Sequence, residues 1–291
     1  MINTIEKKYY PYWFVVPGLA IYFIFFVAPN IMAFFYSFTD WSLLECNFIG
    51  LQNFYELFSN PSYVIAFKNT ILFTIFVTVF KMAFGFLLAL LLNMEIKSKG
   101  YLRTIFYLPC ILSTLAVGLI FSSLYHPTNG LINKAFEFIG LGFLAQDWLG
   151  NASIVIFSTS MVEIWKWTGF HMVIFLAGIQ SIPKEHFEAA SIDGANKWQT
   201  LKHIIIPMIR GAINTNFIFC IIFGLRVFEI IFTTTQGGPG YASEVINTLV
   251  FRNFSNGYLG LSTAGGLMLS IIVAAIGLPL NYYLGKKEVE L

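Results

Sequence analysis

The stretch SIPKEHFEAASIDGANKWQTLKHIIIP, residues 181–207, decides the fold and stands between two long apolar runs. Its proline, glycine and small polar residues have the spacing of helix ends rather than of a flexible linker. Ser181 can cap a helix with Pro183 in its first turn. Gly194 can end that helix, because the left-handed conformation wanted at a helix C-terminus suits glycine. The stretch therefore predicts a first short helix that ends at Gly194.

A second short helix is predicted directly after Gly194. Asn196 can cap it, and Gln199 three residues later resembles the partner of a capping box. Pro207 then marks the start of the next apolar run. The helix pair has an apolar side and several charges, which suits either docking into a groove on a partner protein or lying on lipid headgroups. The pattern alone leaves both interpretations open.

The composition excludes a water-soluble domain. Of the 291 residues 57% are apolar and only 11% are Asp, Glu, Lys or Arg, where soluble domains carry about 25%. Disorder is excluded too, since 32 residues are Phe and disordered chains are poor in aromatics. The formal net charge of +2 is too small to suggest a nucleic-acid partner. The chain is therefore predicted to be an all-α polytopic membrane protein.

Six apolar stretches are long enough to cross a bilayer, which takes about 20 residues of helix. They cover residues 12–35, 71–92, 105–124, 154–179, 209–232 and 261–284. The longer connections between these stretches are predicted to form short helices and loops. None of the connections is large enough for a separate domain. Residues 1–291 are therefore predicted to form a single transmembrane domain.

The positions of Lys and Arg predict the orientation of the spans. Eleven of these residues fall at the two termini and in the second-to-third and fourth-to-fifth connections, and only three fall in the other connections. Positive charge accumulates on the cytoplasmic side of membrane proteins. Both termini and the loop 181–207 are therefore predicted to be cytoplasmic.

With Arg210 counted in the fourth-to-fifth connection, five ionisable residues fall inside the predicted spans, namely Lys81, Glu163, Lys166, Arg226 and Glu229. Each costs about 2.5–3.5 kcal/mol on insertion scales and is expected to face a cavity or a partner. Glu163 and Lys166 are three residues apart, as are Arg226 and Glu229, so each pair could form an ion pair on one helix face. The alternative is a polar lining for a translocation path. Lys81 has no acidic neighbour three or four residues away, so we predict that it pairs with a charge on another helix or subunit.

The sequence has no motif of an enzyme active site. No GxxxxGK[ST], HExxH or GxSxG occurs, and the three cysteines lie far apart with no CxxC spacing. We therefore expect no metal, no cofactor and no catalytic residue on this chain. Energy for transport must come from a separate subunit or from an ion gradient.

Residues 188–194, EAASIDG, followed after nine residues by IIIP at 204–207, resemble the EAA loop of ABC importer permeases. The family pattern ends in Ile-x-Leu-Pro, so Ile206 is a conservative departure. The resemblance implies a type I ABC importer permease fold, in which this loop is the coupling helix that sits in a cleft of the ATPase subunit. The coupling residues that it implies are Glu188, Ala189, Ala190, Asp193, Gly194 and Pro207.

Four further segments are similar to the maltose, multiple-sugar and glycerol-phosphate group of these permeases. They are RTIFYLP (103–109), YHPTNGLIN (125–133), WKWTGF (165–170) and TQGGPG (235–240). In that group the substrate contacts come from the fourth and fifth spans. The substrate-path residues implied here are Glu163, Trp167, Phe170, Phe223, Arg226 and Glu229. These types differ from the amide-rich pattern of the family, which predicts a different substrate.

The resemblance implies a machine in the bacterial cytoplasmic membrane. It consists of this chain, a second and different permease that forms a heterodimer with it, an ABC ATPase dimer with ATP and Mg, and an extracellular sugar-binding protein. An oligosaccharide is the favoured cargo, with a polyol phosphate as the alternative because Arg226 and Lys166 could bind an anion. The rival class is an ion-coupled secondary transporter with Glu163 or Glu229 as a proton relay. Nothing in that class requires the pattern of residues 188–207.

Overall fold

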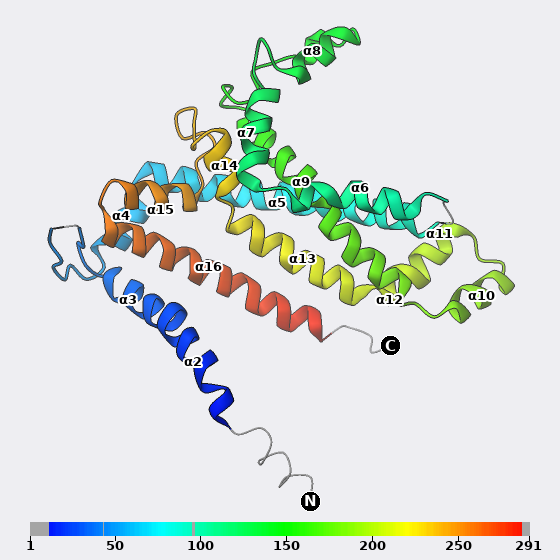
Figure 1. The fold of residues 1–291 in the computed structure, drawn as a ribbon, viewed down its shortest axis with the longest axis horizontal. Helices are drawn as coiled ribbons and strands as arrows, with labels where there is room; N and C mark the ends of the chain where they lie inside the picture. The colour runs from blue at the N-terminus through cyan, green and yellow to red at the C-terminus, as the bar shows by residue number, and fades with distance from the viewer. Residues whose placement is uncertain (1–11, 43, 95–96, 287–291) are drawn as a thin grey trace, which may run out of the picture. The chain divides into compact units, whose positions relative to one another are not determined.

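The computed structural model describes residues 12–42, 44–94 and 97–286 (Figure 1). The regular elements of these residues are helices, with an isolated bridge between Thr39 and Phe48. Lys7, Lys8 and Lys287, which contribute to the predicted orientation, lie outside the described residues.

The chain divides into two compact units. The first consists of Met1–Ser59 and Val250–Met268, and the second of Asn60–Leu249 and Leu269–Leu291. Two helices, α15 (Ile246–Ser255) and α16 (Leu259–Gly285), contribute residues to both units.

The first unit contains one long apolar helix and a short helix. Its elements are η1 (Tyr12–Phe14), α2 (Val16–Tyr22), η2 (Phe23–Val27), α3 (Ala28–Tyr36) and α4 (Gln52–Ser59). The helix that runs from α2 through α3 buries none of its residues inside the unit. Asn53 on α4 is buried, and its side-chain amide donates to the carbonyls of Ser37 at 3.0 Å and Thr39 at 2.8 Å. One buried amide therefore joins α4 to the turn that follows α3.

The second unit contains the remaining helices. They are α5 (Pro61–Asn93), α6 (Lys99–Ile111), α7 (Thr114–Leu124), α8 (Leu131–Phe138), η3 (Gly142–Leu144), α9 (Val155–Gln180), α10 (Lys184–Ile192), α11 (Lys197–Thr200), η4 (Leu201–Ile205), α12 (Ile206–Met208), α13 (Arg210–Leu225) and α14 (Glu229–Thr234). α9 packs along α5 and α6, α13 packs on α5 and α9, and α7 packs on α14 (Figure 1). α9 is therefore the helix around which this unit is built.

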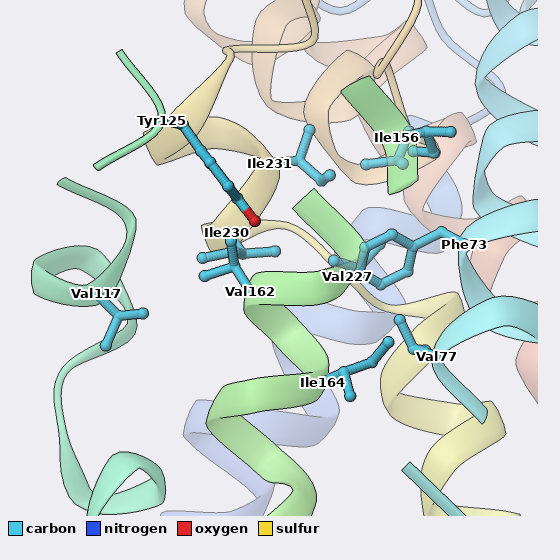
Figure 2. Close-up of a cluster of buried hydrophobic side chains, with 11 residues drawn as sticks. Phe73, Val77, Val117, Tyr125, Ile156, Val162, Ile164, Val227, Ile230 and Ile231 are labelled. Atoms are coloured by element: carbon cyan, nitrogen blue, oxygen red, sulfur yellow. The ribbon is translucent and has the colours of Figure 1, made fainter. Parts of the chain in front are cut away.

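Two clusters of buried apolar side chains hold α9 in place. Figure 2 shows the first, in which Phe73 and Val77 of α5 meet Val162 of α9 and the α14 residues Ile230 and Ile231. The second cluster lies further along α9 and includes the buried residues Ala89, Leu92, Met172, Phe175, Leu176, Ile179 and Ile209. Burial of each such side chain contributes about 1.5–3 kcal/mol. On α9, Glu163 lies between two residues of the first cluster, and Lys166 lies between the two clusters.

Four of the predicted spans correspond to continuous helices. The helix over Val16–Tyr36, α9 and α16 lie within a few residues of the predicted bounds. α5 begins at Pro61, ten residues before the predicted start at 71. The reason is local, because the Asn60 side chain accepts from the Ser62 N–H and Pro61 occupies the first turn.

The other two predicted spans are broken, which corrects the prediction of continuous helices. The span over 105–124 is divided into α6 and α7, which meet at 94°. Leu112 and Ser113 between them are extended, three residues after Pro109, which cannot donate a helical hydrogen bond. The span over 209–232 is divided into α13 and α14, and the backbone of Arg226 to Phe228 leaves the helix.

Three helices of the described residues are long and apolar enough to cross a membrane, and two bent pairs would bring the number to five. The three are Val16–Tyr36, α5 and α16, and the bent pairs are α6 with α7 and Lys197–Met208 with α13. α9 is the remaining predicted span, and it carries several buried polar residues among its apolar ones. The count of six spans and the side on which the termini lie stay predictions.

Candidate functional site: a cavity between two broken helices

A cavity of about 390 Å³ opens beside α9 in the second unit. The residues that line it and that were predicted for the substrate path are Glu163, Trp167, Phe223, Arg226 and Glu229. They come from α9, from the end of α13, from the break that follows α13, and from the first residue of α14. The structure thus brings together five of the six predicted residues, and their role as substrate contacts stays a prediction.

The sixth predicted residue, Phe170, is not part of the lining. Its ring meets Trp167 edge-on, with 6.2 Å between the ring centroids, and lies 6.0 Å from the Phe219 ring. Phe170 therefore packs against the tryptophan that lines the cavity. Its predicted contact with the substrate stays a prediction.

Aromatic rings form one wall of the cavity. The centroids of Trp167 and Phe223 are 6.4 Å apart, and Phe223 is stacked on Phe219 at 5.6 Å. Phe223 is about half exposed. Such rings offer flat apolar surface, and their faces carry the negative part of the ring quadrupole. This wall suits the apolar face of a ring-shaped ligand whose edge is polar.

Both helix breaks border the cavity. Thr114, the first residue of α7, lines it, and so does the segment from Arg226 to Phe228 between α13 and α14. Irregular backbone at membrane depth is tolerated only where protein buries it or where it lines a cavity. Broken helices form the binding sites of many membrane transporters, because their free backbone groups point at the cargo.

A buried ion pair stands at the cavity edge. The Lys81 Nζ donates to Glu163 Oε1 at 2.8 Å, and Lys81 is 1% exposed. The prediction that Lys81 pairs with a charge on another helix is confirmed, since Lys81 is on α5 and Glu163 on α9. The pairing of Glu163 with Lys166 within α9 is wrong. Glu163 is thereby neutralised while it still lines the cavity.

Lys166 is bound to backbone rather than to a carboxylate. Its Nζ donates to the carbonyls of Leu112 at 2.8 Å and Cys110 at 3.2 Å, and lies 4.5 Å from the centre of the Trp167 ring. These carbonyls belong to the end of α6, where a helix leaves acceptors without partners. The lysine therefore provides hydrogen-bond donors for the free carbonyls at the break between α6 and α7.

Arg226 and Glu229 are both exposed to the cavity, and the prediction that they pair on one helix face is wrong. The helix ends at Leu225 and the next begins at Glu229, so the spacing of three residues does not place them on one face. In the part of the chain that the structure describes, no ion pair joins them. Their charges are thus available to a ligand.

Sequence reasoning missed two parts of this region. Thr114 lines the cavity, and the signal for it was the Ser-Thr pair after Pro109, which suits a new helix start. The other is a buried polar cluster in which His171 Nδ1 lies 2.7 Å from Asn216 Oδ1 and the Cys220 sulfur lies 3.4 Å from His171 Nε2. No local signal identifies it, because its residues come from α9 and α13. Among the described residues, no group of three or more His, Cys, Asp or Glu side chains could hold a metal ion.

The loop 181–207 has the two predicted helices. α10 ends at Ile192, Gly194 has φ of +73°, and Asn196 and Gln199 form both hydrogen bonds of a capping box at the start of α11. The predicted cap at Ser181 is wrong. Its hydroxyl donates to the Gly178 carbonyl, and Pro183 takes the position before α10. The helix pair and its turn were therefore predictable in detail, apart from that cap.

The turn of this loop encloses a hollow of about 480 Å³. Four of the six residues predicted for coupling line it, namely Ala189, Ala190, Asp193 and Gly194. Glu188 is exposed on α10 outside the hollow, and Pro207 lies on α12. Phe187 and Leu201 pack against the second apolar cluster, so the helix pair is fixed to the core of its unit. No partner is present to test the coupling role, which stays a prediction.

Apolar helices long enough to cross a bilayer, a cavity between broken helices and a helix pair joined by a left-handed glycine together define a membrane transport subunit. Residues 81–285 match the family of binding-protein-dependent transport system inner membrane components. The chain belongs to this family. It is a multi-pass component of a membrane and a transport subunit, not an enzyme.

Several relatives are described as sugar transport permeases. The chain is 32% identical over 289 residues to the multiple sugar-binding transport system permease protein MsmF of Streptococcus mutans. The alignment covers 98% of each chain. A chain of a bacterial ABC transporter that imports the acidic polysaccharide alginate has the same fold, with a TM-score of 0.84, 27% identity and 98% of both chains covered. A chain of a bacterial alginate ABC transporter, solved in complex with an alginate pentasaccharide-bound periplasmic protein, matches with a TM-score of 0.82 and 28% identity, over 96% of this chain and 95% of that one.

Proposed function

We propose that this chain is one half of the translocation path of an ABC importer for a neutral oligosaccharide. The observation that carries the proposal is the cavity itself, whose lining combines aromatic rings with carboxylate and guanidinium groups. Sugar hydroxyls are both donors and acceptors, so a lining with both kinds of partner suits them. Pyranose rings have an apolar face that stacks on aromatic rings.

The charges of the cavity favour a neutral sugar over a polyol phosphate. Glu229 lines the cavity together with Arg226 and, in contrast to Glu163, has no ion-pair partner among the described residues, so an anion that meets the arginine also meets an unbalanced carboxylate. Lys166, which could have served an anion, is bound to two carbonyls. Like charges held close in a medium of low dielectric are strongly unfavourable. An acidic cargo such as the alginate of the structural relative is therefore disfavoured here.

The energy for transport is proposed to come from a separate ABC ATPase dimer that binds ATP and Mg and docks on the loop 181–207. The rigid turn at Gly194 and the exposed Glu188 support this, because a compact helix pair fixed to the core can transmit a push. A second homologous permease would supply the other half of the path, and an extracellular binding protein would deliver the sugar. The binding protein seen with the alginate transporter supports this last assignment.

Co-purification tests the assembly. The chain carries a C-terminal tag, is extracted in mild detergent from its native host, and its companions are identified by mass spectrometry. A second permease together with an ABC ATPase is the expected result. Recovery of the chain alone, with uptake that collapses when the ion gradient is removed, would contradict the proposal and favour a secondary transporter.

Uptake by the purified complex in proteoliposomes tests the cavity. Trp167→Ala should raise the KM for the sugar about tenfold or more, since an aromatic stacking platform contributes about 1–3 kcal/mol, while the assembled complex is recovered normally. Unchanged kinetics of Trp167→Ala with several neutral sugars would remove that residue from the path.

The docking of the ATPase on the loop 181–207 is tested separately. Glu188→Lys should weaken ATPase association and leave membrane insertion intact.

A further inference from the structure

Each helix break beside the cavity is held by a single side chain that donates to two carbonyls. At the break between α6 and α7, Lys166 of α9 donates to the Cys110 and Leu112 carbonyls. At the break after α13, the Asn247 amide of α15 donates to the Arg226 carbonyl at 2.9 Å and the Val227 carbonyl at 3.3 Å. Both donors come from a helix other than the broken one.

Lys166 is suited to its break by charge as well as by reach. The last carbonyls of a helix have no partner inside the helix, and the C-terminal end of the helix dipole is negative. A buried ammonium that meets two such carbonyls is satisfied without a carboxylate. Lys166 is 1% exposed, so water does not replace it there. A residue without a cation at this position leaves the end of α6 without a partner.

Asn247 does the same with a neutral amide, and it acts directly on residues of the cavity. Arg226 and Val227, whose carbonyls it binds, both line the cavity. The position of the Arg226 guanidinium therefore depends on a side chain that is itself outside the lining. Loss of the amide frees the backbone from which Arg226 projects.

The helices beyond the two breaks are joined to each other. α7 and α14 pack so closely at Gly118 that a Cβ there would overlap the hydroxyl of Thr233. Val117 of α7 and Ile230 of α14 lie in the same apolar cluster (Figure 2). A shift at one break is therefore transmitted to the helix that follows the other break.

We propose that Lys166 and Asn247 are positioning residues for transport, which set the shape of the cavity by holding its two helix breaks. Neither needs to touch the cargo. Because α7 and α14 are packed together, the two residues act on one shared wall. The effect on cargo affinity rests on the proposed function, in which the cavity binds the transported sugar, whereas the effect on the helix breaks does not.

Transport kinetics of the complete complex in proteoliposomes provide the first test. Lys166→Met should raise the KM for the sugar about tenfold, because a charge-assisted bond is lost at a cavity wall, with a smaller change in the maximal rate per complex. Lys166→Arg keeps the charge and the donors and should restore KM to within about threefold of the wild type. Asn247→Leu should raise KM in the same way as Lys166→Met.

The matched control is Asn53→Leu. Asn53 also donates to two carbonyls from a buried amide, but it lies in the first unit and not at the cavity. Its loss should lower the yield of assembled complex and leave KM unchanged. If the Lys166 and Asn247 variants likewise change only the yield, with KM at the wild-type value, their role is merely structural and the proposal is wrong.

A distance measurement tests, in the absence of cargo, whether Lys166 holds the break between α6 and α7. Spin labels at Tyr101 on α6 and Leu119 on α7, which are both exposed, report the bend in the detergent-solubilised complex once the three native cysteines are replaced. Lys166→Met should broaden or shift the distance distribution, and Lys166→Arg should return it to the wild-type one. An unchanged distribution in Lys166→Met overturns the proposal. If the wild-type complex transports no sugar but Lys166→Met still alters the distance distribution, the proposed function is wrong. The role of Lys166 in holding the helix break is then still supported.

Discussion

The loop 181–207 and the cavity are both made of short helices separated by a turn, but the turns are fixed in different ways. In the loop, the turn is held by neighbours in sequence, since Asn196 and Gln199 cap each other's backbone and Gly194 supplies its own conformation. At the cavity, the turns are held by Lys166 and Asn247, which are about 20 to 55 residues away from the carbonyls that they bind. Helix ends fixed by local capping can be read from a sequence, whereas those fixed by distant side chains cannot.

The largest expected loss of stability follows from breaking a contact between residues distant in sequence, the ion pair of Lys81 and Glu163. Lys81→Met leaves a buried carboxylate without its partner and should lower the free energy of unfolding by about 3–5 kcal/mol. The measurement is the thermal stability of the complex in detergent, together with its yield. The double variant Lys81→Met with Glu163→Leu removes both charges and should regain most of the loss. A single Lys81→Met variant as stable as the wild type would contradict the buried pair.

The next effect concerns the contact of α7 with α14. Gly118→Ala places a methyl group on the Thr233 hydroxyl, and overpacking of this kind costs about 1–3 kcal/mol. Thr233→Ala removes the hydroxyl, the nearest obstructing atom, but leaves the Thr233 Cβ at 2.6 Å from the new methyl group, so the double variant should recover only part of the stability and uptake. Equal loss in the single and double variants would show that the two helices are not in close contact at this point.

These contacts explain how much of the molecule was predictable. Apolar stretches predicted α9, α16 and the helix over Val16–Tyr36, because a 20-residue apolar run needs no partner to be recognised. They did not predict the breaks, because an apolar composition is the same in a straight helix and in a bent one. Pro109 was visible in the sequence, but what holds the bend is Lys166 on another helix.

The site shows the same division. Trp167 and Arg226, which were predicted for the substrate path from different parts of the sequence, line one cavity, and their role there stays a prediction. The partners of the charged residues were assigned wrongly where the assignment relied on spacing along one helix. Lys81 was assigned correctly in kind because it had no local partner, which left only a distant one.

A smaller effect is expected at the turn of the loop. Gly194 has φ of +73°, and a left-handed residue with a side chain costs about 1–2 kcal/mol. Gly194→Ala should therefore lower the stability of the helix pair, and Gly194→Asn should lower it less because asparagine tolerates this conformation. The measurement is hydrogen exchange of the amides in residues 184–205. Equal protection in Gly194→Ala and the wild type would show that the turn adapts without strain.

The smallest effects separate a cap that the sequence only suggests from one that the structure forms. Asn196→Ala removes both the acceptor for the Gln199 N–H and the box, and should cost about 1 kcal/mol in local stability. Ser181→Ala removes a hydroxyl that donates to the Gly178 carbonyl and caps no helix start. Its cost should be a few tenths of a kcal/mol, as for an exposed hydrogen bond that water can replace. Hydrogen exchange at the first turns of α10 and α11 measures both. A loss of local stability for Ser181→Ala as large as that for Asn196→Ala would show that Ser181 acts as a helix cap, as the sequence predicted. The two helix starts of the loop would then be capped to a similar extent.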